Sequence, residues 1–514
     1  MSKQQILWAD DEIDLLKPHI LFLQNKGYEV TTVTNGRDAL DAMATQNFNL
    51  IILDENMPGI SGLEALQQIK IQQPNVPVIM ITKSEEENIM NQAIGGEIAD
   101  YLIKPVNPMQ ILSSIKKNLH SEALVTQKVT IDYQQQFMNI SQRINSASAI
   151  EDWYDIYSTL VRWELTLSNT ETNMDEMLRM QKSEANAAFA KFVKRNYEQW
   201  ITTDNHPVMS HQVFKSAVVP LLNEGHKVCF IVIDNFRFDQ WRIISPMLSD
   251  LFNVESEQLY TTILPTATQY ARNAIFSGLL PVDIEKMFPD LWVDEDEDEG
   301  KNLNEAPLIQ TFLDRYRLRY RFSYNKVNDS TGGDKLIQNF ASLDSYDLNV
   351  MVFNFIDMLS HARTESKMIR ELANTDLAYR SITESWFRNS YAYEVFKLIA
   401  ERGWKIVLTT DHGTIQTNNA VKVIGDRNTN TNLRYKVGKN LSYNNKQVYE
   451  IRNPKKLGLP SPNVSSAYIF CMNNDFFAYP NNYNYYVQYY TGTFQHGGIS
   501  MEEMLAPLIT LTPK

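Results

Sequence analysis

Acidic residues, a threonine and a lysine stand at the ends of successive apolar runs in the first 120 residues. Asp10 and Asp11 follow QILWA, Asp54 ends NLIILD, Thr82 ends VPVIMIT, and Lys104 ends ADYLIK. Phosphoryl transfer to a carboxylate needs a divalent metal to gather negative charge and a cation to hold the product oxygens. These residues supply both: Asp10, Asp11 and Asp54 are candidate Mg²⁺ ligands. Asp54 is then the nucleophile, and Lys104 and Thr82 contact the phosphoryl oxygens.

The same runs alternate with helical stretches such as LLKPHILFLQNKG and LEALQQIKIQQ. Five strands and five helices over residues 1–120 predict the flavodoxin-like, doubly wound parallel sheet. Because the carboxyl ends of parallel strands meet at one edge of a sheet, we expect the five residues to converge there.

The pattern resembles the receiver domains of two-component response regulators. It has the acidic pair, the D-x-x-M-P-G turn (Asp54, Met57, Pro58, Gly59) and a lysine followed by proline. The resemblance implies a sensor histidine kinase as partner and phosphorylation of Asp54. It also implies a switch in which Tyr101, the aromatic shortly before Lys104, changes rotamer together with Thr82. Receivers often pair through their fourth and fifth helices, so a homodimer on phosphorylation is expected.

A second set of metal-ligand residue types is dispersed through the carboxyl-terminal half. The runs HKVCFIVID, LNVMVFNFID and WKIVLTTDHG each lead into an aspartate, and near-continuous apolar strands predict a parallel sheet covered on both faces. The set is Asp234, Thr268, Asp357, His361, Asp411, His412 and His496. Carboxylates and imidazoles beside strand ends fit two borderline metals with N and O ligands.

In this order along the chain, these candidate ligands and Thr268 resemble the site residues of the alkaline-phosphatase superfamily, specifically of its PglZ-type branch. The closing motif H-G-G-x-S-x-x-E is matched by His496, Gly497, Gly498, Ser500 and Glu503. The resemblance implies one zinc held by Asp357, His361 and His496, and another held by Asp234, Asp411 and His412, with Thr268 as the bridging nucleophile. Manganese is the alternative metal. Thr266 is a rival nucleophile, which the family spacing disfavours. Asn235 and Arg272 are candidates for holding phosphoryl oxygens, with ordinary packing as the alternative.

The substrate class follows from a further comparison with the superfamily. The third-metal carboxylate set of its phosphomonoesterases is not evident in this sequence, and a diester needs less positive charge than a monoester. We therefore expect phosphodiesters, of nucleotide type. The Tyr- and Asn-rich stretch 443–490 is either a stacking surface for such a substrate or a packed cap.

Between the two sets lies a segment with helical spacing and almost no Gly or Pro. Helices are expected over Val129–Ile150, Asp152–Leu167 and Asn173–Trp200. The predicted domains are a receiver at 1–120, a helical connector at 121–205 and a larger α/β domain with insertions at 206–514. This layout resembles that of PorX-type regulators of type IX secretion, which implies a secretion-system or transcription-regulatory protein as partner.

Composition limits the remaining possibilities. A chain with 43% hydrophobic and 21% charged residues is typical of a folded protein, and no apolar run approaches the roughly 20 residues that cross a bilayer. The amino terminus lacks a secretory h-region, so we expect the cytoplasm and no membrane insertion. With a formal charge of −13 and no evident basic cluster after the receiver, a conventional DNA-binding output is not expected, and a local positive groove within the acidic chain is the alternative left open. The acidic run 294–299 is predicted to be a solvated loop.

Two hypotheses of different classes follow. The first is a response regulator that controls a zinc-dependent phosphodiesterase. The second is a non-catalytic adaptor or transcriptional regulator whose metals stabilise an interaction domain. Thr268 separates them, because an adaptor has no need of a hydroxyl at the metal bridge.

Overall fold

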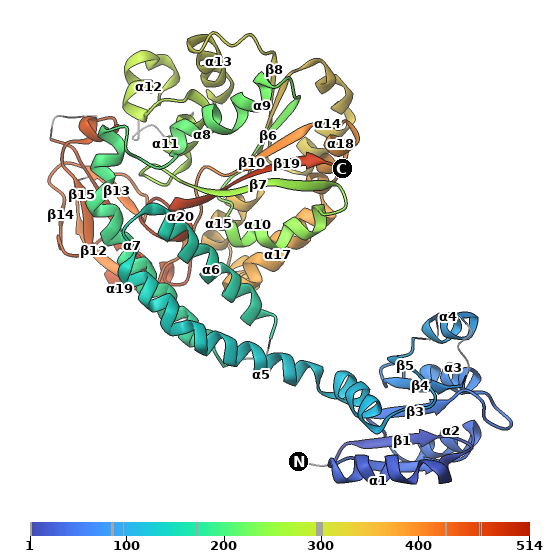
Figure 1. The fold of residues 1–514 in the computed structure, drawn as a ribbon. Coiled ribbons are helices and arrows are strands. Elements are labelled where there is room, and N and C mark those ends of the chain that lie inside the picture. The colour runs from blue at the N-terminus through green and yellow to red at the C-terminus, as the bar shows by residue number, and fades with distance from the viewer. Residues whose placement is uncertain are drawn as a thin grey trace. The chain divides into compact units, whose positions relative to one another are not determined.

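The computed structural model describes residues 3–83, 87–95, 97–170, 173–293, 302–426, 429–461, 463 and 465–514. The acidic run 294–299 lies outside these residues. The chain forms two compact units, Met1–Ile131 and Asp132–Lys514 (Figure 1). None of the helices in the described residues is long and apolar enough to span a membrane.

The first unit is a parallel five-stranded sheet in the order β2-β1-β3-β4-β5. Its strands are β1 (Gln5–Ala9), β2 (Glu29–Val33), β3 (Leu50–Asp54), β4 (Val78–Thr82) and β5 (Asp100–Ile103). Its helices are α1 (Lys17–Asn25), α2 (Gly36–Thr45), α3 (Gly62–Gln72), α4 (Glu87–Gly95) and the start of α5 (Pro108–Ser146). One core packs α2, α3 and α4 against the sheet, and a second packs α1 and α5 against its other face. The predicted flavodoxin-like receiver fold is confirmed.

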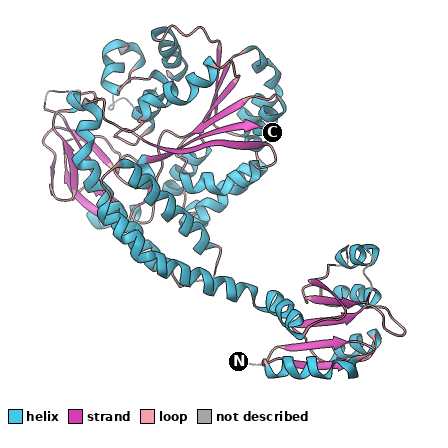
Figure 2. Ribbon diagram, viewed as in Figure 1, coloured by secondary structure: helices cyan, strands magenta, loops and turns pink. Residues whose placement is uncertain are grey.

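The connector is helical, as predicted (Figure 2). It contains the end of α5, then α6 (Ile150–Ser168) and α7 (Asp175–Thr202). One boundary differs from the expectation. The helix expected to begin at Val129 is the continuation of the last receiver helix, because no glycine or proline interrupts the chain between Pro108 and Ser146.

The second unit is built on a six-stranded sheet in the order β7-β19-β10-β6-β9-β8. Its strands are β6 (Val228–Ile233), β7 (Phe252–Thr261), β8 (Phe322–Val327), β9 (Leu348–Phe353), β10 (Lys405–Thr409) and β19 (Leu505–Pro513). The four strands from β10 to β8 are parallel, and β19 is antiparallel to both of its neighbours. Helices cover both faces, with α8, α9, α11 and α13 on one and α10, α15 and α17 on the other (Figure 1).

The remaining elements of this unit cover or border the sheet. The helices are α8 (Ser210–Val213), α9 (Val219–Asn223), α10 (Phe238–Ile244), α11 (Thr268–Ser277), α12 (Pro281–Met287), α13 (Glu305–Arg315), α14 (Ser330–Gln338), α15 (Phe355–Glu365), α16 (Lys367–Leu372), α17 (Asp376–Asn389), α18 (Tyr391–Glu401), α19 (Tyr483–Tyr490) and α20 (Met501–Met504). Three small sheets hold β11 (Ile415–Gln416), β12 (Asn419–Ile424), β13 (Tyr435–Gly438), β14 (Ser442–Tyr443), β15 (Val448–Ile451), β16 (Ala467–Cys471), β17 (Asp475–Ala478) and β18 (Phe494–Gln495). The prediction of a larger α/β domain with insertions is confirmed.

Candidate metal and phosphoryl sites

The receiver residues converge at the carboxyl edge of the five-stranded sheet. The Nζ of Lys104 lies 2.8 Å from Oδ2 of Asp10 and 3.1 Å from Oδ1 of Asp54. Carboxylate oxygens of Asp10, Asp11 and Asp54 all lie within 4.8 Å of one another, with Asp11 exposed and the other two buried. An oxygen-only set of this kind suits Mg²⁺, which takes few protein carboxylates and keeps several waters.

Burial governs the electrostatics of the phospho-acceptor. It raises the pKa of Asp54 to about 6, an effect that Lys104 opposes and Asp10 reinforces. A divalent cation beside these carboxylates stabilises their charged forms, so metal binding and deprotonation of Asp54 favour each other.

Thr82 and Tyr101 lie beside this edge. Thr82 ends β4 and is fully buried, whereas Tyr101 on β5 is partly buried. Burial raises the pKa of Tyr101, and its hydrogen bond with the Thr82 side chain acts in the opposite direction. The two candidate switch residues are therefore in direct contact.

In the second unit, Thr268 and three predicted ligands meet at the carboxyl edge of the larger sheet. Asp234 directly follows β6, Asp411 and His412 follow β10, and Thr268 is the first residue of α11. The Oγ1 of Thr268 lies 3.2 Å from Nε2 of His412 and 3.5 Å from Oδ1 of Asp234. Nε2 of His412 is 3.9 Å from a carboxylate oxygen of each aspartate.

The other three predicted ligands form a neighbouring group. Asp357 and His361 are four residues apart on α15 and so share one helix face, and Nε2 of His361 lies 3.5 Å from Oδ2 of Asp357. His496 follows β18, and its Nε2 is 3.9 Å from Oδ1 of Asp357. The rings of His412 and His496 stack with centroids 4.2 Å apart, so the two groups lie side by side.

Two of the three candidate histidine ligands have the form that metal binding requires. Nδ1 of His412 lies 3.1 Å from the carbonyl oxygen of Gly413, and Nδ1 of His496 lies 3.1 Å from that of Thr266. Such a bond fixes the tautomer with Nε2 free to ligate. Burial, reinforced by His412 and His361, lowers the pKa of His496 well below its usual value, which keeps the ring neutral. The donor set therefore fits two metals of the zinc type.

The two threonines of the L-P-T-A-T segment are in different environments. Thr266 is fully buried, and its Oγ1 donates to the Gly498 carbonyl over 2.9 Å and accepts from the Gly497 amide over 3.0 Å. Its hydroxyl thus holds the backbone next to His496. Thr268 faces the ligand group, so of the two hydroxyls it is the one placed to attack.

The contacts of Arg272 differ from those expected of a phosphoryl-binding arginine. Its guanidinium is fully buried and pairs with Asp234, with Asp411 (Nε to Oδ2, 3.0 Å) and with Glu305 (Nη1 to Oε1, 3.1 Å). Its guanidinium donors are directed at the ligand carboxylates, which favours the packing alternative over contact with a phosphoryl group. Burial raises the pKa of Asp234 well above its usual value. At Asp411, burial is outweighed by Arg272 and His412, which together lower the pKa of that carboxyl.

Asn235 also differs from its predicted role. Its Nδ2 donates to Oδ1 of Asp357 over 3.3 Å and to Oγ of Ser360 over 3.1 Å, and its backbone N–H donates to Oδ1 of Asp411 over 3.4 Å. With φ at 62°, it occupies the left-handed region that asparagine tolerates. Asn235 links the two ligand groups, and its side-chain donors are not left for phosphoryl oxygens.

Several residues beside the site were not predicted. Glu503 of the closing motif forms a buried ion pair with Arg434, and its Oε1 accepts from the Gly498 amide over 2.8 Å. Asn186 of α7 accepts from the Met501 amide over 2.8 Å and donates to Glu502 over 2.9 Å. Glu503 belongs to the closing motif, but its partner Arg434 and the bracing residue Asn186 come from distant segments that no local motif marks.

A fourth acidic cluster is a network of ion pairs. Carboxylates of Glu164, Asp239 and Asp376 lie within 4.8 Å of one another. Arg380 Nη1 lies 2.7 Å from Glu164 and 3.1 Å from Asp239, and Arg237 Nη1 lies 2.7 Å from Asp376. Because cations already neutralise these carboxylates, the cluster joins connector helix α6 to α10 and α17 and is not a metal site.

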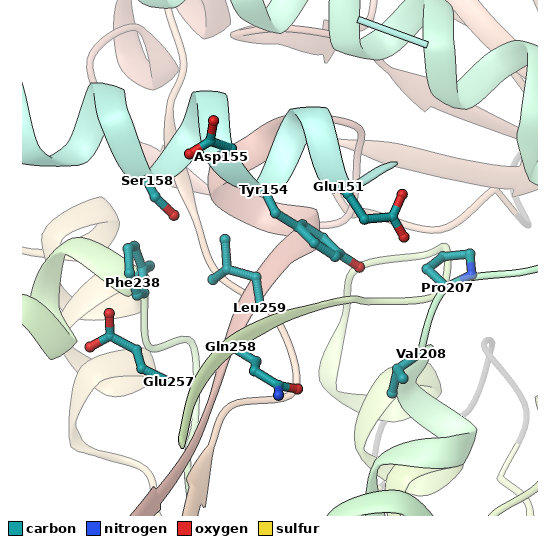
Figure 3. A pocket seen from close by; sticks show the side chains of 10 residues that line it. All are labelled: Glu151, Tyr154, Asp155, Ser158, Pro207, Val208, Phe238, Glu257, Gln258 and Leu259. Carbon is teal, nitrogen blue, oxygen red and sulfur yellow. The ribbon is translucent and has the colours of Figure 1, made fainter. Parts of the chain in front are cut away.

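One cavity, of about 460 Å³, lies apart from the metal-ligand groups. Figure 3 shows Glu151, Tyr154, Asp155 and Ser158 of α6 facing it, with Glu257, Gln258 and Leu259 of β7 across from them. None of the residues that line it is a candidate metal ligand or nucleophile, so this cavity is not a candidate site for metal-dependent phosphoryl chemistry.

Comparison with known proteins agrees with this architecture. The response regulator receiver domain matches residues 6–116, the PorX response regulator linker domain matches 123–201, and the BREX system PglZ alkaline phosphatase-like domain matches 213–511. The chain is 33% identical over 131 residues to the uncharacterized transcriptional regulatory protein YkoG of Bacillus subtilis, covering 25% of this chain and 57% of that protein. It is 27% identical over 165 residues to the alkaline phosphatase synthesis transcriptional regulatory protein PhoP of the same organism. That match covers 32% of this chain and 67% of that protein.

Solved structures match the receiver part. A CheY-like receiver domain protein from Methanospirillum hungatei is 28% identical, with 23% of this chain and 96% of that chain covered and a TM-score of 0.23. The response regulator TrrA from Thermotoga maritima, solved with Mg²⁺ and BeF, is 32% identical. The match covers 23% of this chain and 99% of that chain, with a TM-score of 0.21.

The family matches come in the predicted order, receiver, PorX-type linker and PglZ domain, and the last spans more than half of the 514 residues. A receiver implies a histidine kinase as partner and Mg²⁺ as cofactor, and alkaline phosphatase-like domains are metal-dependent. The chain therefore belongs to the PglZ family of alkaline phosphatase-like proteins, in the PorX-like arrangement with an amino-terminal response-regulator receiver.

Proposed function

We propose that phosphorylation of Asp54 controls a zinc-dependent phosphodiesterase formed by the carboxyl-terminal domain. The single observation that carries this is the position of Thr268, whose Oγ1 lies 3.2 Å from Nε2 of His412 and 3.5 Å from Oδ1 of Asp234. A hydroxyl between two candidate ligand side chains suits attack on phosphorus, whereas a purely structural metal site has no use for it.

In this proposal each ligand group holds one zinc ion. Asp357, His361 and His496 form one set, and Asp234, Asp411 and His412 form the other. When bound there, two zinc ions would supply positive charge for the attacking and leaving oxygens of a displacement at phosphorus. The chain itself supplies Thr268 as nucleophile, while Arg272 and Asn235 hold the carboxylates in place.

The proposed substrate is a nucleotide-type phosphodiester. The tyrosines of α19 form a ladder, with Tyr485 over Tyr489 and Tyr486 over Tyr490 at ring distances of 6.0 and 6.1 Å. Tyr485 is 62% exposed. Exposed aromatic faces stack on bases of any sequence, which supports this substrate class.

The regulation that we propose follows from the receiver. A sensor histidine kinase phosphorylates Asp54 in the cytoplasm, Thr82 and Tyr101 respond, and the protein dimerises. Its output acts on type IX secretion through a secretion-system or transcription-regulatory partner. The functional divisions are the receiver at 1–120, the connector at 121–205 and the output domain at 206–514.

The test is hydrolysis of bis(p-nitrophenyl) phosphate and of p-nitrophenyl phosphate by the zinc-loaded full chain. We expect two bound zinc ions, faster turnover of the diester, and loss of turnover on chelation. Faster turnover of the monoester would overturn the substrate assignment. Zinc binding without turnover of either ester would instead favour the adaptor hypothesis, which the transcriptional relatives of the receiver also support.

A further inference from the structure

Connector helix α7 carries a basic face. Lys191, Lys194 and Arg195 are exposed and stand at positions i, i+3 and i+4, which share one side of a helix. Phe192 and Val193 between them are buried and hold the opposite side of the helix against the domain. The three cations therefore project together into solvent.

A second basic segment lies against this face. It follows β15 and contains Arg452, Lys455 and Lys456. Nζ of Lys194 donates to the Val448 carbonyl over 3.4 Å, and Lys456 forms an ion pair with Glu198, one turn beyond Arg195 on α7. These two contacts bring the segment 452–456 next to the basic face of α7.

The segment 452–456 lines a hollow of about 690 Å³, and the basic face of α7 lies next to this segment. The described residues that line it are Arg452, Asn453, Pro454, Lys455, Lys456, Ser461 and Asn463. This lining contains three cations, two amides and a hydroxyl, and no carboxylate. Such donors match the oxygens of phosphate groups.

The local charge is opposite to that of the chain. Of the six cations, two are paired: Arg452 with Glu450 at 2.9 Å, and Lys456 with Glu198. Among the described residues, no carboxylate forms an ion pair with the other four. A basic surface of this kind on a chain with a formal charge of −13 selects anions from solution. A local positive groove was the alternative that the sequence left open, and this surface is of that kind; its two basic segments lie about 260 residues apart in the chain.

We propose that this basic hollow binds the phosphate backbone of a single-stranded nucleic acid. One phosphate would occupy only part of it, whereas cations along a helix face and a loop match phosphates repeated along a strand. None of these residues is a candidate ligand or nucleophile, so the site is distinct from the metal centres. It gives the protein a nucleic-acid contact without a DNA-binding domain, and its binding does not depend on the proposed hydrolysis.

The experiment measures fluorescence anisotropy of a labelled 12-nucleotide single strand with the full chain in a Thr268→Val background, which keeps the probe intact. The double variant Arg195→Gln/Lys455→Gln removes two unpaired, exposed cations. Its control, Lys286→Gln/Lys335→Gln, removes two exposed lysines elsewhere in the same unit with the same change of charge.

We expect the first variant to weaken binding at least fivefold and to lower the slope of log K against log salt by about 1.4, since each single-strand contact contributes about 0.7. The control should stay within twofold of the parent. Equal weakening by both variants, or no binding by the parent, would overturn the site. Tighter binding of tripolyphosphate than of the single strand would overturn nucleic acid as the ligand in favour of a small polyphosphate. Binding of polyglutamate as tight as that of the strand would overturn specific recognition of phosphate.

Discussion

Arg272 stands one helical turn after Thr268 on α11, and its Nε donates to Oδ2 of Asp411 over 3.0 Å. Both partners of this ion pair are fully buried. The first turns of one helix thus present the candidate nucleophile and the cation that holds the ligands around it. The position and orientation of the candidate ligand carboxylates therefore depend on a buried arginine behind them.

Replacing Arg272 by methionine should destabilise the second unit by about 3–5 kcal/mol, because the buried carboxylates of Asp234 and Asp411 lose their arginine partner, while Glu305 keeps its ion pair with Lys326. Arg272→Lys keeps a charge but loses the planar fork, so we expect an intermediate effect. Thermal unfolding and zinc retained after dialysis measure both consequences. Arg242→Met, at a partly exposed pair with Glu257, is the control and should cost no more than about 1 kcal/mol. Equal stability and zinc content in Arg272→Met and wild type would contradict the orienting role.

Asn186 joins the connector to the closing motif, through the Met501 amide and the Glu502 carboxylate. Asn186→Ala should cost about 1–3 kcal/mol, because both buried partners then lose a hydrogen bond. Denaturant unfolding of the full chain measures this. The matched control is Asn196→Ala on the same helix, whose side chain donates to the Phe192 carbonyl within α7. If the two variants have the same stability, the connector does not brace the motif.

The raised pKa of Asp54 predicts a pH dependence in metal-free protein. Between its ordinary value of 3.8 and about 6, the unfolded chain has lost a proton that the folded receiver keeps. Stability conferred by this group is thus fully present below pH 3.8 and is lost as pH rises through about 6. We expect a loss of about 1–3 kcal/mol, allowing for partial solvent screening.

Calorimetry of the full chain in the presence of a chelator measures this loss of stability. The receiver's unfolding transition is identified as the one that shifts when Mg²⁺ is added. Asp54→Asn lacks the titrating group and should be the more stable protein above about pH 6. An Asp54→Asn variant with the pH dependence of wild type would show that another group is responsible.

A phosphoryl mimic should raise the dimer fraction. Beryllofluoride with Mg²⁺ shifts the equilibrium between the inactive and active receiver states only by the difference in its affinity for them. That difference is typically worth a few kcal/mol, which is enough to change the dimer fraction measurably. Sedimentation velocity measures the shift, and Asp54→Asn with the same additives is the control. An unchanged sedimentation profile in wild type would count against dimerisation on phosphorylation.

The sequence predicted the elements whose signal is local. Apolar runs that end in Asp54, Asp234 and Asp411 predicted both the strands and the edge at which they meet, since parallel strands present their carboxyl ends together. The unbroken α5 was missed because the receiver pattern suggested an end that no residue between Pro108 and Ser146 enforces.

Roles that depend on burial were not predictable in this way. In the sequence Arg272 resembles a phosphate-binding arginine, but in the folded unit its guanidinium lies behind Asp411. Asn235 likewise resembles a phosphate-binding amide, but its Nδ2 bonds to Asp357. The basic hollow could not be located from the sequence for the same reason, since the side chains of α7 and of 452–456 become neighbours only in the folded unit.

The most direct test of the central claim compares Thr268→Ser and Thr268→Val for hydrolysis of bis(p-nitrophenyl) phosphate, with zinc content measured on the same samples. Serine keeps the hydroxyl beside His412, and valine keeps the shape without it. We predict two zinc ions in both variants, substantial turnover by Thr268→Ser, and a loss of roughly a thousandfold or more in Thr268→Val. A zinc-loaded Thr268→Val variant that turns over within about tenfold of wild type would contradict the assignment of Thr268 as nucleophile.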